Sequence, residues 1–182
     1  MFILPLLKIP QEVSVALSTD LKRKHEYPLD GLRVVKKERT LVRLEREWRA
    51  LINTWEGLPE DILLQPGAVG HWSVRDVMAH IATWNEEAMK ALPIILEGKP
   101  LPRYMGIDAF NAREQERKQH LSLEQVKRDV LVTYNKLTDY LQKVPENAFG
   151  SPRFTKRLRL DTIGHYREHA TQIVAWRSEK GY

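Results

Sequence analysis

Four long segments constrain the fold most, because in each of them apolar residues recur every three or four positions. This spacing lines one face of an α-helix and does not fit the two-residue alternation of a half-buried strand. The segments run from about 35 to 56, from 73 to 98, from 122 to 144 and from about 161 onward. Four amphipathic helices in 182 residues are typical of one all-α domain, a four-helix bundle.

Residues with known helix-end preferences mark the boundaries of these segments. Ser73 with Asp76, and Ser122 with Gln125, have the spacing of a capping box, and Asp161 is a good N-cap for the last helix. Two connections are longer than ordinary bundle turns. The first, 99–121, is expected to hold a short helix near 108–118. The second, 145–160, is expected to be a loop with a short extended piece at 154–160.

Residues 1–35 show no sustained periodicity, so we treat them as an N-terminal extension of unclear role and residues 36–182 as the bundle domain. The opening MFILPLLKIP is apolar, but Lys8 and Pro10 interrupt it and no basic region precedes it. We therefore expect neither a signal peptide nor a membrane span. The chain has no cysteine, which excludes disulfides and thiolate-based sites. We expect a cytoplasmic protein without a membrane partner.

The formal net charge of +5 is spread along the chain, with acidic and basic residues interleaved. Nucleic-acid binders usually concentrate basic residues on one face, so we do not expect a nucleic-acid partner. One basic cluster precedes the last helix. A solvated loop is favoured there over a subsite for an anionic substrate; its members are Arg153, Lys156, Arg157 and Arg159.

Three histidines are the strongest candidates for chemistry. His165 and His169 are four residues apart, one turn on the same helix face, and His80 lies on the apolar side of the second helix. Three imidazoles would form an open divalent-metal site with room for water or substrate. From spacing alone, the alternative of core histidines hydrogen-bonded to Tyr166, Gln172 or the backbone is equally good. If Asp161 caps the helix, its dipole favours a neutral His165.

Two stretches, GHWSVRDVMAHIATW and GHYREHATQIVAWR, resemble the DinB-like superfamily, a group that includes maleylpyruvate isomerase and colibactin self-resistance proteins. The resemblance covers residues 38–178. It implies an up-down-down-up bundle, often a homodimer, in which His80, His165 and His169 hold a divalent metal, zinc or nickel. It also implies a small-molecule substrate, such as a low-molecular-weight thiol, although no thiol-binding signature is found.

Three functions are open at this point. The leading one is a metal-dependent enzyme of the thiol transferase, isomerase or hydrolase type. The second is a non-catalytic bundle that binds a small molecule or protects against it, and the third, nucleic-acid binding, has the least support. No catalytic residue is assigned. The polar neighbours considered for acid–base or hydrogen-bonding roles are Asp161, Glu168, Asn111 and Tyr166.

Overall fold

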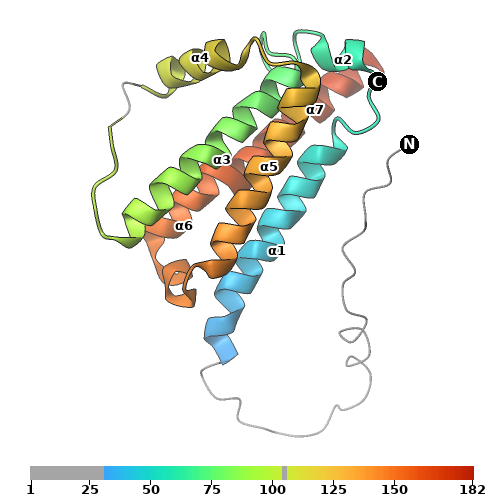
Figure 1. Cartoon of the computed structure of the whole chain (residues 1–182). Coiled ribbons are helices and arrows are strands. Elements are labelled where there is room, and N and C mark those ends of the chain that lie inside the picture. The colour runs from blue at the N-terminus through green and yellow to red at the C-terminus, as the bar shows by residue number, and fades with distance from the viewer. Residues whose placement is uncertain (1–30, 104–105) are drawn as a thin grey trace, which may run out of the picture.

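The computed structural model describes residues 31–103 and 106–182 and shows four long helices side by side (Figure 1). They are α1 (Gly31–Asn53), α3 (Val74–Leu96), α5 (Leu123–Lys143) and α7 (Gly164–Lys180). Helices α1 and α7 run in one direction and α3 and α5 in the other (Figure 1). The all-α bundle expected from the sequence is confirmed. Most of the extension expected at 1–35 lies outside the described residues.

The two predicted capping boxes are present with both of their hydrogen bonds. The Ser73 hydroxyl accepts from the backbone N–H of Asp76, and the Asp76 carboxylate accepts from the Ser73 backbone. Ser122 and Gln125 make the same pair of bonds at the start of α5. The short helix expected near 108–118 is α4 (Ile107–Lys118). A further short helix, α2 (Glu60–Leu64), was not anticipated.

The connection at 145–160 is helical, so the expectation of a loop with an extended piece was wrong. A 3-10 turn, η2 (Glu146–Gly150), leads into α6 (Pro152–Leu158), the π-helical turn η3 (Arg159–Ile163) and then α7 without a break. Ser151 caps this helix by accepting from the backbone N–H of Phe154. Phe154 and Leu158 are fully buried, and this burial stabilises the added turns.

Helix α3 is the centre of the bundle, in contact with α4, α5, α6, α7 and η3. Two of its polar residues, Thr83 and Glu87, are only 3% and 7% exposed. An amphipathic surface helix would turn such residues to solvent, whereas α3 is covered nearly all round. No helix in the described part of the chain is long and apolar enough to cross a membrane.

Aromatic stacking and a buried hydrogen-bond chain join three of the long helices. Trp48 of α1 stacks on Tyr134 of α5 with ring centroids 4.0 Å apart. The Tyr166 hydroxyl of α7 donates to Asn85 of α3, whose amide in turn donates to Thr133 of α5 at 3.3 Å. The side chains of Tyr166, Asn85 and Thr133 are all buried, so their polar atoms have to be satisfied by these hydrogen bonds and not by water.

We predict that Tyr166→Phe lowers the free energy of unfolding by about 1–3 kcal/mol, because the buried Asn85 oxygen loses its donor. Tyr140→Phe is the matched control, since the buried Tyr140 hydroxyl has no hydrogen-bond partner among the described residues. That variant should be neutral or slightly more stable. Urea denaturation of the three proteins measures the difference, and equal stability of the two variants would contradict the prediction.

Candidate metal centre

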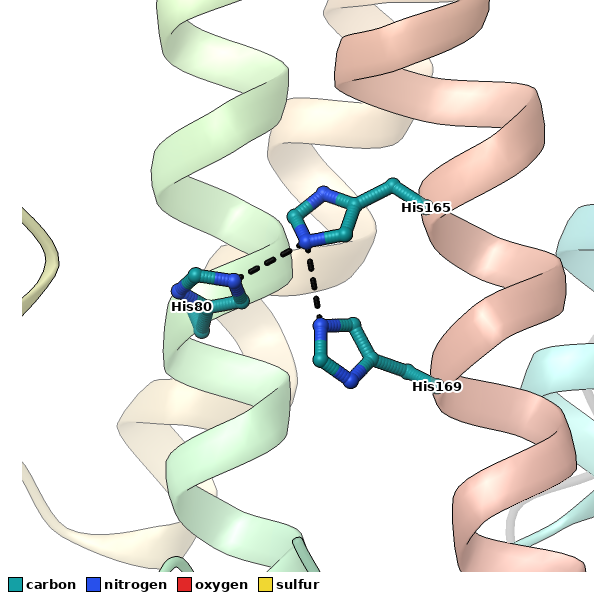
Figure 2. Close-up of side chains that lie close together, drawn as sticks. All are labelled: His80, His165 and His169. Atoms are coloured by element: carbon teal, nitrogen blue, oxygen red, sulfur yellow. Dashed lines mark hydrogen bonds between the residues drawn. The ribbon is translucent and has the colours of Figure 1, made fainter. Parts of the chain in front are cut away.

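The structure brings together all three histidines singled out in the sequence. His80 comes from α3, and His165 and His169 come from α7, with their rings turned toward a common point (Figure 2). The Nε2 atom of His165 lies 2.9 Å from that of His80 and 3.0 Å from that of His169. Among the described residues, this is the one group of three or more His, Asp or Glu side chains arranged to hold a metal.

The backbone before His165 is not the helix start that the sequence suggested. Asp161 lies inside the π turn, is 2% exposed, and accepts a hydrogen bond at 2.5 Å from Arg157 instead of capping a helix. The dipole of a free helix end therefore does not act on His165. A π turn holds one more residue than an α turn, so it shifts the direction in which the following side chains point.

Gly164 makes this turn possible, because a Cβ atom there would lie 3.0 Å from the carbonyl oxygen of Arg159. This distance is tighter than most Cβ contacts, and the atom in the way is backbone, which cannot move aside easily. The glycine directly before His165 thus has a packing role.

Burial keeps the three rings neutral. His80 and His169 are 7% and 5% exposed, and His165 is slightly more accessible. Burial, with the neighbouring His165 and His169, lowers the pKa of His80 to about 2. Burial and His169 lower the pKa of His165 to about 3, and burial also lowers the pKa of His169. The neutral imidazole is the form that binds a metal. Desolvation, and not the helix dipole expected from the sequence, is the cause of this neutral state.

The hydrogen bonds of the Nδ1 atoms, which face away from the cluster, indicate which Nε2 atoms carry no proton. The Nδ1–H of His169 donates to Gln172 Oε1 at 2.7 Å, which leaves His169 Nε2 as a bare lone pair. His165 Nδ1 is buried and makes no hydrogen bond of normal geometry in the described structure, although the nearby backbone of Asp161 raises the pKa of the ring somewhat. Gln172 is one of the hydrogen-bond partners that the sequence offered for the histidines.

The donor set fits a small divalent cation better than it fits three hydrogen-bonded rings. A proton on His165 Nε2 can bond only one of its two neighbours and leaves the other lone pair facing it at about 3 Å. A cation satisfies all three nitrogens. Adjacent ligands about 2.1 Å from a metal lie roughly 3.0–3.4 Å apart in octahedral or tetrahedral geometry, which is close to the two distances measured from His165, and all three ligand atoms lie within 4.8 Å of one another.

Aromatic side chains surround the three rings. The Trp72 ring lies 4.7 Å from His80, and the Trp84 ring lies 5.7 Å from His165. Phe110 of α4 packs on Trp84 at 5.5 Å, and Asn111 accepts a hydrogen bond from the Trp84 indole at 3.2 Å. These rings place apolar surface beside the histidines.

The polar neighbours considered from the sequence have other tasks. Tyr166 belongs to the core hydrogen-bond chain and Glu168 is exposed. Asn111 holds Trp84, and Asp161 is paired with Arg157. The basic cluster at 153–159 is helical, so the expectation of a loop was wrong, whereas three of its four members are exposed as expected. Arg157 is largely buried, and Arg153 donates to the Lys99 carbonyl.

Arg75, which the sequence did not single out, positions α4 near the site. Its side chain is 8% exposed, and its Nη2 donates to the carbonyls of Lys118, Gln119 and Leu121 at 2.6–3.1 Å. The guanidinium thereby caps the C-terminal end of α4, which supplies Phe110 and Asn111. A long-range bond of this kind leaves no local pattern in the sequence.

We predict that the metal-free protein loses stability as the pH falls below about 6.5. The folded pKa values of the histidines are lowered, so below 6.5 the unfolded chain binds protons that the folded chain does not. His80→Gln should reduce the slope of unfolding free energy against pH by about 1.4 kcal/mol per pH unit between pH 6 and 5. The control is His120→Gln, at an exposed histidine; equal slopes in the two variants would refute the assignment.

Comparisons with known proteins agree on the fold. An uncharacterised protein from Escherichia coli UTI89 aligns over 80% of this chain and 94% of its own, with 17% identity and a TM-score of 0.68. The colibactin self-resistance protein ClbS, solved in complex with a dsDNA, aligns over 78% and 95%, with 12% identity and a TM-score of 0.69. A protein from Streptococcus pneumoniae aligns over 87% and 94%, with 14% identity and a TM-score of 0.66.

No curated protein matched the sequence. The family model described as the DinB superfamily matches residues 43–174, which contain α3, α5, all three histidines, most of α7 and the C-terminal part of α1. Because this match spans well over half of the chain, the protein belongs to the DinB superfamily.

Proposed function

We propose that this protein binds one divalent metal, zinc or nickel, through His80, His165 and His169 and acts on a small molecule beside it. The observation that carries the proposal is the convergence of three imidazoles, two buried and one partly buried, whose facing nitrogens a single cation would satisfy together. The reaction class is thiol transfer, isomerisation or hydrolysis. A bound metal supplies a lowered pKa for a coordinated water or thiol and polarises an electrophile.

Described residues around the three histidines prepare this chemistry. Gln172 holds His169 in the tautomer that points Nε2 inward. Trp72 and Trp84 limit the access of water to the rings, which strengthens electrostatic interactions inside the site. We further propose a low-molecular-weight thiol as substrate, a homodimeric assembly and a cytoplasmic location; these rest on the family resemblance.

The second candidate is a bundle that binds or sequesters a small molecule without turning it over. It is favoured by the similarity to ClbS, whose name describes self-resistance to colibactin. That structure also holds a dsDNA, so binding of DNA is a separate outcome to measure. Turnover of a thiol with a panel of electrophiles, compared between metal-loaded and metal-free protein, separates enzyme from binder. DNA affinity measured at several salt concentrations tests the third function.

We predict about one equivalent of zinc or nickel per chain in protein purified without a polyhistidine tag. His169→Ala and His165→Ala should lose most of this metal while the bundle stays folded, because two imidazoles hold a divalent ion less well than three. His120→Ala, at an exposed position, should keep it. Elemental analysis and circular dichroism measure both properties. Full metal retention in His169→Ala would remove that residue from the ligand set.

We predict that Gln172→Leu weakens metal binding by about ten- to a hundred-fold without removing a ligand, because the His169 ring loses the bond that orients it. Thr171→Val, on the exposed neighbour of Gln172, is the control and should leave the dissociation constant unchanged. Competition with a metal-binding dye gives both constants. If Gln172→Leu binds as tightly as the unaltered protein, the hydrogen bond does not orient the ligand.

A further inference from the structure

A groove of about 750 Å³ lies between α1 and α5, away from the histidines. Helix α1 packs on α7 and η2, whereas α5 packs on α3, so the two helices run side by side without closing the space between them (Figure 1). The floor of the groove is the stacked pair Trp48 and Tyr134. Its α1 wall includes Leu41 and Val42, the latter 60% exposed.

One end of the groove, where Lys37 lies, carries two carboxylates. Lys37 joins the two helices there by donating to the carbonyls of Gln142 and Val144, both at 2.7 Å. Glu38 and Glu146 line the same end. The Oε1 atom of Glu146 is buried and has no hydrogen-bond partner among the described residues. A cation beside this carboxylate would compensate its buried charge.

We propose that residues 1–8 of this same chain occupy the groove, with MFILPLL lying along it and Lys8 beside Glu146. The segment has six Met, Phe, Ile or Leu residues and one proline among its first seven. Pro5 disfavours a helix and favours an extended chain before it. Six extended steps span about 20 Å, and the α1 residues from Lys37 to Arg49 that line the groove span about 18 Å.

The direction of the chain supports this register. Helix α1 begins at Gly31, near the Lys37 end of the groove, so the chain returns to that end after leaving the groove. Leu7 and Lys8 then lie at this end, Met1 lies toward Arg49, and Leu4 lies opposite Val42. The lysine that ends the apolar run is thereby placed beside the Glu146 oxygen that has no hydrogen-bond partner in the described part of the chain.

Covalent linkage makes weak contacts sufficient. Residues 9–30 form a tether of 22 residues, whose root-mean-square span as a flexible chain is about 25 Å. The tether presents residues 1–8 to the groove at an effective concentration on the order of millimolar. An intrinsic dissociation constant near 1 mM for the segment therefore gives substantial occupancy of the groove. A second copy of the bundle fits the groove less well than the segment does. A two-fold axis through the groove would place one hollow surface against another, so neither groove would be filled.

Disulfide trapping tests the proposal, since the chain has no cysteine of its own. The test pair combines Leu4→Cys with Val42→Cys in the groove. The control pair combines Leu4→Cys with Val174→Cys on α7, which lies outside the groove and has a similar exposure of 55%. Under mild oxidation, the first pair should form an intramolecular disulfide at least ten-fold faster than the second. Adding Lys8→Glu to the first pair should slow it several-fold. Circular dichroism checks that each variant is folded.

Two outcomes would overturn the proposal. Equal rates for the two pairs would mean that the segment does not reside in the groove. A disulfide that appears only as a cross-linked dimer on a non-reducing gel would assign the groove to the segment of a second copy. Because the groove and the histidines share no residue, both outcomes are independent of whether the protein binds a metal.

Discussion

The hydrogen bond between Tyr166 and Asn85 is the interaction on which the site depends most. Asn85 lies five residues after His80 on α3, and Tyr166 directly follows His165 on α7. The bond therefore fixes the rotation of α7 against α3 beside the point where the histidines meet. Both partners are fully buried, so any register that separates them leaves two polar groups unsatisfied. The same contact that holds the core together thus sets the spacing of the three imidazoles.

The π turn before α7 is the second condition for the site. An α-helical turn in its place would rotate the side chains that follow by about 100° relative to the preceding helix. Gly164 permits the turn. Asp161 lies within the turn and pairs with Arg157, which lies in the last turn of α6. Irregular turns of this kind are frequent at functional sites, because they aim a side chain where a regular helix would not. Here, the side chain is His165.

The histidine cluster and the α1–α5 groove lie in different parts of the bundle. The cluster lies between α3 and α7, where burial is nearly complete and aromatic rings form the walls. The groove lies where two helices are not closely packed. Solved relatives share the fold at 12–17% identity, so the bundle tolerates extensive substitution, and function has to be argued from the side chains in these two places.

The sequence by itself determined the four helices, their two capping boxes and the choice of His80, His165 and His169, because helical periodicity and capping act within about four residues. Only the tertiary structure decided the rest. It buried Thr83 and Glu87 at the bundle centre and gave Asp161 to Arg157 instead of a helix end. It also extended the last helix back to Pro152. Each of these depends on which surfaces meet across the bundle or on an irregular turn, and neither leaves a periodic signal along the chain.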